Sequence, residues 1–383
     1  MKVGQTVKLT KPPTKEIPVP VVKKGKINDL FIFDNLGRKA VTSASAGEVV
    51  CFGGMENVEI GDTLLSGTDV CKDPLPPIFV ESPTVKMTFG VNKSPLGGKE
   101  GKFLTSRMIR DRLMKELDKN VSLKVEEGAS SDIYEVSGRG QLHLTVLIEE
   151  MRREGFEMEI GPPKVIMRMN EETGKREEPW EKLEIRVPDE YLGKIVDLLN
   201  SRKGEMLEMG KEEEMSSLVF LIPTRGMLGL RSAAMTSSRG TALIDSVFHS
   251  YRPEVKGMIG APGDNGSLLA HSSGSANSNG IAGAQDRGKM FIAPGDEVYK
   301  GMIVGVHQRP GDLEINVCKM KQLTNMRASG KDNWVGIVTP LELTLDGGVE
   351  YISEDEVLEV TPTKIRMAKN PNFVKQGRPS RIK

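Results

Sequence analysis

The stretch from Tyr134 to Pro163, YEVSGRGQLHLTVLIEEMRREGFEMEIGPP, has the clearest pattern in this chain of 383 residues. β-branched and aromatic side chains precede two glycines, and apolar residues then recur at the helical spacing i, i+3, i+4, i+7, namely Leu144, Leu147, Ile148 and Met151. The pattern predicts a strand, a glycine turn and an amphipathic helix. Gly155 predicts the end of that helix, and Phe156 to Ile160 a second strand that the following prolines terminate.

The length of the chain predicts two to four domains, because single hydrophobic cores stop growing well below this size. With 38% apolar and 28% charged residues, the composition is typical of soluble globular proteins, and no apolar run is long enough to span a bilayer. The N-terminal run MKVGQTVKLTKPP lacks the apolar centre of a signal peptide. Cys51, Cys71 and Cys318 show no paired spacing, so we expect a reduced, cytoplasmic protein without membrane contact.

The formal net charge of zero hides an uneven distribution. The segment from Lys319 to Lys331 has four basic residues and no acidic one, and the segment from Thr361 to Lys383 has seven and none. The rest of the chain is acidic, which favours a localised contact with a polyanion. For residues 370–383 a solvated, disordered tail is an equally good interpretation.

The order of predicted elements divides the chain into four parts. Short β-prone runs separated by turn residues predict a small antiparallel β-barrel over residues 1–78. Residues 79–163 and 164–256 each show the order β-α-β-β-α-β, which predicts two ferredoxin-like domains. Residues 257–383 are predicted to form a β-rich C-terminal domain that begins with a Gly-, Ser- and Asn-rich loop over residues 263–283. The expected fold class is therefore multidomain α+β.

Several motifs occur in a fixed order along the chain: GRGQLHLTVLIEEMRREGF, PPKVI, IPTRGMLGLRS, AQDRGKMF, QLTNMRASG and EVTPTKIR. Together they resemble the translational GTPases, and most closely the BipA/TypA ribosome-binding GTPases, over essentially the whole chain. The resemblance implies the barrel that is the second domain of these proteins, ferredoxin-like domains of the elongation factor G domain III and V type, and a family-specific RNA-binding C-terminal domain. Gly347 and Gly348 depart from the expected pattern because each glycine weakens a helix by about 1 kcal/mol.

The resemblance also implies a GTP-binding domain that is absent from this chain. The nearest approach to a phosphate loop, GGKEGK over residues 97–102, has the wrong glycine interval and is followed by Phe103 where Ser or Thr would hold magnesium. We therefore expect this chain not to be an enzyme and to hold no cofactor, with GTP and Mg confined to the missing N-terminal domain. The expected partners are the ribosome, through rRNA and A-site tRNA, and the protein's own GTPase domain. The expected role is translation regulation or large-subunit assembly under stress, as a monomer in the cytoplasm or an organelle stroma.

The segment KMKQLTNMRASGKDNW carries the main prediction for a binding site. Its cations can neutralise phosphates, its amide and hydroxyl groups can form hydrogen bonds, and its tryptophan can stack on a base. The predicted RNA-binding residues of this loop are Lys319, Lys321, Asn325, Arg327, Ser329, Lys331 and Trp334. Through its other motifs the resemblance adds Arg287, Lys289, Lys364 and Arg366. The alternative is that Leu323 and Trp334 anchor an ordinary loop whose cations are merely solvated.

No catalytic or metal-binding residues are predicted. His143, His249, His271 and His307 lie on different predicted elements without a second ligand at metal-binding spacing, and His143 is expected to pack or cap within its domain. Two other functions stay open. One is a free-standing RNA-binding adaptor, and the other is a serine hydrolase that uses His271 and the serines of the 263–283 loop, although no G-x-S-x-G elbow is present.

The missing phosphate loop predicts that this chain does not bind GTP. Calorimetric titration with GTP and magnesium should give no saturable heat, because no backbone cradle is available for the triphosphate. A saturable signal at micromolar nucleotide would overturn this expectation.

Overall fold

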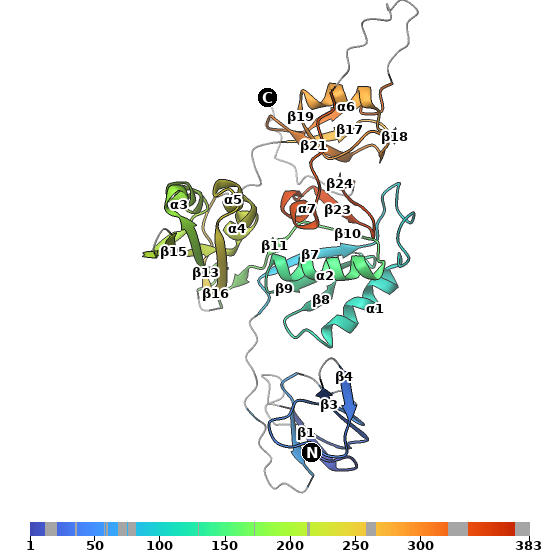
Figure 1. The fold of residues 1–383 in the computed structure, drawn as a ribbon, viewed down its shortest axis with the longest axis vertical. Helices are drawn as coiled ribbons and strands as arrows, with labels where there is room; N and C mark the ends of the chain where they lie inside the picture. The colour runs from blue at the N-terminus through green and yellow to red at the C-terminus, as the bar shows by residue number, and fades with distance from the viewer. Residues whose placement is uncertain are drawn as a thin grey trace, which may run out of the picture. The chain divides into compact units, whose positions relative to one another are not determined.

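The computed structural model of the chain is shown in Figure 1. It describes residues 1–11, 21–34, 37–56, 58, 60–67, 75, 82–128, 130–171, 173–212, 215–257, 266–320 and 336–371. Residues Met1–Val80 form one compact unit and Glu81–Lys383 form a second. The described part is an α+β, β-rich structure with seven α-helices, none of them long and apolar enough to cross a bilayer.

The first unit contains two three-stranded antiparallel sheets. One has the order β2 (Val21–Lys26), β1 (Thr6–Lys11), β6 (Thr63–Ser66), and the other the order β4 (Gly37–Ala40), β3 (Asp29–Asp34), β5 (Val50–Gly53). Val7, Ile27 and Leu30 are buried at its core. The β-prone runs over residues 21–22, 30–33, 48–52 and 63–65 fall on β2, β3, β5 and β6. No run was predicted at β1 or β4, whose lysines, arginine and glycine weaken the β signal. Closure of these sheets into a barrel stays a prediction.

An eleven-stranded sheet runs through the second unit (Figure 1). Its main path has the spatial order β22 (Leu313–Ile315), β17 (Ser267–Ala270), β21 (Met302–His307), β24 (Ile365–Lys369), β23 (Glu356–Val360), β10 (Met158–Ile160), β7 (Val85–Gly90), β9 (Ile133–Gly138) and β8 (Lys124–Glu127). In addition, β11 (Lys164–Val165) pairs with β7, and β19 (Gly288–Met290) pairs with β21. All of these pairings are antiparallel except that between β17 and β22.

Two helices cover one face of this sheet at the β7–β9 end. Helix α1 (Ser106–Leu117) starts after Thr105, whose hydroxyl accepts a hydrogen bond from the backbone N–H of Met108. Helix α2 (Gln141–Glu154) ends at Gly155, which adopts the left-handed conformation. The predicted stripe of α2 is confirmed, because its four apolar residues, Leu144, Leu147, Ile148 and Met151, are all buried.

Strand β23 joins the C-terminal segment to the sheet beneath α2. Strand β10 pairs with β7 on one side and with β23 on the other, where Ile160 lies opposite Leu358. Every residue of β23 is buried. Leu358 and Val360 belong to the core beneath α2, whereas Val357 belongs to a second core that includes residues of α6 (Ser278–Gln285). Strand β23 is therefore covered on both faces and contributes side chains to both cores.

Helix α7 (Leu345–Tyr351) contains the two glycines that departed from the expected pattern. A Cβ atom on Gly348 would lie 2.7 Å from a methyl carbon of Leu358, so the glycine allows α7 to pack closely against β23. The Thr344 hydroxyl caps the helix by accepting a hydrogen bond from the Gly347 N–H at 3.2 Å. Close packing and a cap therefore offset the low helix propensity of these glycines.

A separate sheet forms from the segment between β11 and β17. Its main part has the order β14 (Glu205–Glu212), β15 (Met215–Pro223), β13 (Arg176–Pro188), β16 (Leu243–Pro253), and β12 (Arg168–Met169) also pairs with β13. Its helical segments are η1 (Asp189–Tyr191), α3 (Leu192–Ser201), α4 (Thr224–Met227) and α5 (Leu230–Ser237). Ile195 and Leu199 of α3 are fully buried, and Val196 is partly buried. Leu228 and Gly229, whose φ is +66°, separate α4 from α5.

The loop predicted for residues 263–283 was wrong for its described part. Residues 266–283 include β17, β18 (Gly274–Ser275), which pairs with β20 (Glu297–Val298), and most of α6. A Cβ atom on Gly280 would lie 2.3 Å from the carbonyl oxygen of Val317. Small residues are therefore needed here because the helix packs directly against backbone, and the same composition is typical of loops.

Removing one buried side chain from either helical core should lower the free energy of unfolding. We expect Leu147→Ala and Ile195→Ala each to cost about 2 to 5 kcal/mol, because each leaves a cavity in a closely packed interior. The matched control is Leu142→Ala, on α2 like Leu147 but 64% exposed, which should change the free energy by no more than about 0.5 kcal/mol. Urea unfolding followed by circular dichroism measures all three. Equal midpoints for Leu147→Ala and Leu142→Ala would show that the buried face of α2 is misassigned.

Candidate nucleic-acid interface

The predicted RNA-binding loop leaves the described structure just after β22. Lys319 is exposed, and so is Met320. The other six predicted residues of this loop, Lys321, Asn325, Arg327, Ser329, Lys331 and Trp334, lie outside the described residues. The structure therefore defines the base of the loop, where the chain departs at Met320 and returns at Gly336.

The returning segment is held by hydrogen bonds to two elements of the C-terminal part. The side-chain amide of Gln285, at the end of α6, donates to the carbonyl oxygen of Val338 at 3.2 Å. The N–H of Leu341 donates to the carbonyl oxygen of Met290, at the end of β19, at 2.8 Å. The base of the loop is thus fixed to a helix and to a strand of the large sheet.

Arg287 and Lys289 lie between these two attachment points in the sequence and are exposed. The carbonyl oxygen of Arg287 accepts a hydrogen bond from the Gln308 N–H at 3.0 Å, and Lys289 lies in β19 opposite Val306 of β21. Their backbones are held by neighbouring strands while their charged ends are exposed to solvent. This geometry brings two of the predicted cations to the base of the predicted loop.

Lys364 and Arg366 differ from these residues in their surroundings. The ammonium group of Lys364 is about half exposed and forms an ion pair with Asp296 at 2.9 Å. The Arg366 side chain is only 6% exposed, and its guanidinium binds Glu100 and Glu359, both at 3.2 Å. Lys364 can still reach a partner, but direct RNA contact through Arg366 does not fit its buried position. The motif TPTKIR gave no sign of this difference. Its alternation of polar and apolar residues does not identify a carboxylate partner that lies far away in the sequence.

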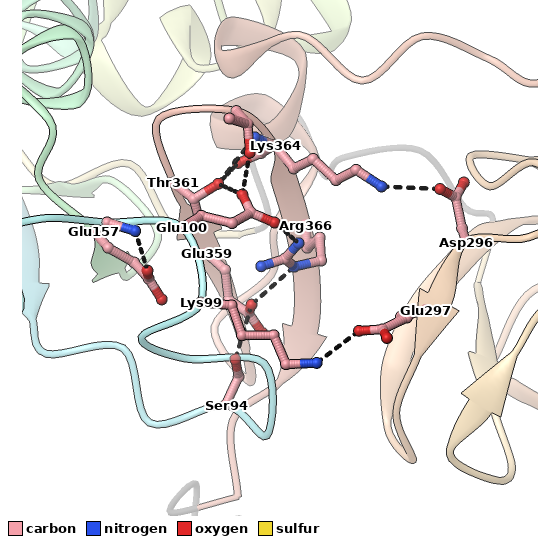
Figure 2. Close-up of polar contacts among 12 residues, drawn as sticks. Ser94, Lys99, Glu100, Glu157, Asp296, Glu297, Glu359, Thr361, Lys364 and Arg366 are labelled. Carbon is pink, nitrogen blue, oxygen red and sulfur yellow. Dashed lines mark hydrogen bonds and ion pairs between the residues drawn. The ribbon is translucent and has the colours of Figure 1, made fainter.

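Arg366 belongs to a polar cluster that Figure 2 shows in close-up. Glu100 accepts hydrogen bonds from Thr361, Thr363 and Arg366, and these lower the pKa of its carboxyl group although burial alone would raise it. Glu359 is almost fully buried and accepts from Ser94 at 3.0 Å and from Tyr299. Burial raises the pKa of Glu359 and outweighs the opposing effect of Arg366. One nitrogen of Arg366, Nη2, is buried without a hydrogen-bond partner among the described residues.

The glycine-rich run over residues 97–102 binds the protein's own carboxylate. The N–H groups of Gly98 and Gly101 donate to the fully buried Glu157 at 2.8 and 2.9 Å, and the side chain of Asn92 donates at 2.7 Å. A Cβ atom on Gly101 would lie 2.4 Å from the Cβ of Glu157, so only glycine allows this approach. The run that resembles a phosphate loop is therefore a closed structural turn.

Two exposed ion pairs connect the turn over residues 293–297 to its neighbours, one from the glycine-rich run and one from the residue before β24. Lys99 pairs with Glu297 at 2.7 Å, and Lys364 pairs with Asp296 (Figure 2). Exposed pairs of this kind contribute little individually. The more buried contacts attach the loop between β7 and α1 to three segments: Ser94 binds Glu359 of β23, Glu100 binds Arg366 of β24, and Gly98 and Gly101 bind Glu157 just before β10.

The histidines and serines show no catalytic arrangement in the part of the chain that is described. The hydroxyl of Ser272 donates to Asn316 at 3.3 Å, and that of Ser273 accepts from the Lys300 N–H at 3.2 Å, so neither is directed to His271. His143 accepts a hydrogen bond from the Arg139 N–H just before α2 and is hydrogen-bonded to the side chain of Asn120 at 2.7 Å, so it packs within its domain and does not cap the helix. Across the described residues, no three His, Cys, Asp or Glu side chains are grouped to hold a metal ion.

Comparison with known proteins identifies relatives over nearly the whole chain. Residues 265–373 match a family model described as the TypA/BipA C-terminal domain, and residues 175–257 match the elongation factor G C-terminus. The putative elongation factor TypA-like SVR3, chloroplastic, of Arabidopsis thaliana is 48% identical over 356 residues, which is 92% of this chain and 52% of that protein. The large ribosomal subunit assembly factor BipA of Bacillus subtilis is 42% identical over 370 residues, which is 96% of this chain and 59% of that protein.

The chain spans between half and three fifths of the length of these curated relatives. A cyanobacterial relative, the large ribosomal subunit assembly factor BipA of Synechocystis, gives the same result, with 44% identity over 91% of this chain and 58% of that protein. The two family models and the relatives agree with the order of motifs found along the chain. The chain therefore belongs to the BipA/TypA family of translational GTPases.

Proposed function

We propose that this chain is the ribosome-binding portion of a BipA/TypA-like GTPase that acts in large-subunit assembly or translation regulation. The observation that carries this proposal is the match over nine tenths of the chain to relatives named as large ribosomal subunit assembly factors. In this proposal the GTP and magnesium sites belong to the GTPase domain of the full-length protein. The finer assignments are proposals too, namely the β-barrel, the two ferredoxin-like domains, the four domain boundaries, the monomeric state and the location in cytoplasm or plastid stroma.

The proposed RNA contact is centred on the loop base described above. Lys319, Arg287 and Lys289 are exposed there, and the cations of the loop follow directly in the sequence. Positive charges on a supported backbone suit a phosphate backbone, since each contact releases a bound counterion. The partners we propose are rRNA and the A-site tRNA.

A free-standing RNA-binding adaptor is the second candidate, because the predicted RNA-binding segment is contained in this chain. It would bind ribosomes without any GTPase domain. A serine hydrolase that uses the 263–283 loop is not favoured, because Ser272 and Ser273 contact Asn316 and the Lys300 N–H and not His271.

Ribosome binding should depend more on the basic loop than on the C-terminal tail. Replacing Lys319, Lys321, Arg327 and Lys331 with alanine should weaken binding strongly and reduce its dependence on salt, because each cation that binds a phosphate accounts for roughly one released counterion. Truncation after Lys369 should have the smaller effect, because fixing a free tail costs roughly 1 to 2 kcal/mol per residue. Co-sedimentation with ribosomes over a range of salt concentrations makes the comparison. The proposal fails if truncation abolishes binding while the loop variant keeps the parent's salt slope.

We expect the predicted cations to differ in role: Arg287 and Lys289 contact RNA, whereas Arg366 stabilises the fold. Arg287→Ala with Lys289→Ala should reduce the salt slope of ribosome binding by about two, without changing the unfolding midpoint. The matched control, Arg107→Ala with Arg110→Ala on the exposed side of α1, removes the same charge and should leave the slope unchanged. Arg366→Ala should instead destabilise the fold by about 3 to 5 kcal/mol, because it removes the cation that pairs with the buried Glu359 and with the partly buried Glu100. An Arg366→Ala variant with parental stability and a reduced slope would show that Arg366 contacts RNA directly.

A further inference from the structure

The β10–β23 joint, in which Met158–Ile160 pairs with residues 358–360, is only three residue pairs long. Its central pair consists of two carboxylates, because Glu159 of β10 lies opposite Glu359 of β23. Residues directly opposite each other in an antiparallel pair point to the same face of the sheet, with Cβ atoms roughly 4.5 to 5.5 Å apart. Like charges in such a pair repel each other, so ionisation of both glutamates weakens the joint.

Glu359 is well supplied with hydrogen-bond donors. It is almost fully buried, and its carboxylate accepts from Ser94 at 3.0 Å, from Nε of Arg366 at 3.2 Å and from the hydroxyl of Tyr299. Donors and a cation at this distance favour the charged form of a carboxyl group. Of the two opposed glutamates, Glu359 is therefore the one whose surroundings are built for a negative charge.

Glu159 has fewer partners. It is half-buried, and its neighbour on the other side is Gly90 of β7, which offers no side chain. The backbone N–H of Lys93 donates to its carboxylate, but the ammonium group of Lys93 forms an ion pair with Asp132 at 3.3 Å. In the described part of the chain no cation is in ion-pair contact with Glu159, and burial raises the pKa of its carboxyl group more than Lys93 lowers it.

The other charged groups on this face do not compensate Glu159. Glu157, two residues earlier on β10 and therefore on the same side of the strand, is a further carboxylate and is fully buried. Arg366 of β24 pairs with Glu359 and with Glu100. The negative charge of Glu159 also acts on its neighbour, because it adds to the effect of burial in raising the pKa of Glu359. Among the described residues of this face, carboxylates outnumber the cations that pair with them.

We propose that the β10–β23 joint is a proton-sensitive contact, in which Glu159 takes up a proton as the pH falls and the joint is firmer with Glu159 neutral than with both carboxylates ionised. A carboxyl group whose pKa is higher in the closed joint than in the open chain binds its proton more tightly when the joint is closed. The stabilisation is therefore complete in acid and is lost as the pH rises through the raised pKa of Glu159.

The consequence extends beyond the two strands. Strand β23 pairs with β24, and β24 pairs with β21, which also holds β19 at the base of the predicted loop. Protonation of Glu159 thus affects how firmly the C-terminal part is attached to β10. This inference concerns the free chain and does not depend on ribosome binding.

Hydrogen exchange of the full chain, measured by mass spectrometry on peptides that contain β10 and β23, tests the proposal. Glu159→Gln keeps the side chain neutral at every pH. At pH 8 it should slow the exchange of both strands by about two- to fivefold relative to the parent, the range expected when a repulsive cross-strand pair is removed. At pH 4.5 the difference should shrink, because Glu159 of the parent is then largely protonated. Comparing variant and parent at the same pH cancels the chemical exchange rate.

The matched control is Glu127→Gln on β8, which removes the same charge from an exposed position of the same sheet and should leave the exchange of β10 and β23 unchanged at both pH values. Glu359→Gln removes the counterion of the buried Arg366 and should speed exchange at both pH values. The proposal is overturned if Glu159→Gln exchanges like the parent at pH 8, or if its effect is equal at pH 8 and pH 4.5. It is also overturned if Glu359→Gln, and not Glu159→Gln, slows exchange at pH 8.

Discussion

The pairing of β23 with β10 is the constraint on which most of the second unit depends. It places a strand from near the end of the chain beside one that ends at Ile160, and every side chain of β23 is buried. Leu358 and Val360 complete the core beneath α2, so that core is not closed by residues 82–165 alone. In energetic terms, burying one such side chain contributes roughly 1.5 to 3 kcal/mol, and loss of β23 would remove several at once while exposing the edge of β10. The two regions should therefore unfold together.

Placing a strand in the middle of a sheet also puts its polar residues inside the protein. Glu359 and Arg366 are buried because they alternate with core residues on β23 and β24, and each must find a partner where water is excluded. The loop between β7 and α1 supplies Ser94 and Glu100, and its own glycines bind Glu157. Removing one partner of such a pair lowers the free energy of unfolding by more than the intact pair contributes to it, because the other charge is left buried and unpaired. The main effect of this polar network is therefore to select the loop that packs on β23. Its contribution to the free energy of unfolding is smaller.

Local patterns in the sequence were sufficient for α2 and for several strands, but not for α6 or for the way the strands join. The stripe of Leu144, Leu147, Ile148 and Met151 and the glycine that ends α2 act within a few residues, so they can be recognised locally. The pairing of Ile160 with Leu358 cannot, because it depends on complementarity between segments nearly two hundred residues apart. Gly280 and Gly348 show the same limit. In the sequence a glycine indicates a loop or a weak helix, and only the close contacts with Val317 and Leu358 explain why glycine is needed at these two positions. For the candidate site, the motifs of the family resemblance indicated exposed cations such as Lys289 but did not separate them from Arg366, whose carboxylates come from distant segments.

A loop that binds a polyanion needs a base that keeps its position when the cations of the loop contact the anionic groups. The returning segment is hydrogen-bonded to α6 and β19, β19 pairs with β21, and β21 pairs with β24, which leads directly to β23. Each step of this path is a backbone contact within one sheet or a helix packed on it, so the loop base is continuous with the most buried strand of the unit. Cations held in this way lose less conformational entropy on binding than cations on a free segment of the same charge. The same sheet that excludes Arg366 from the surface thus supports the positions from which Lys289 and Arg287 can reach a phosphate backbone.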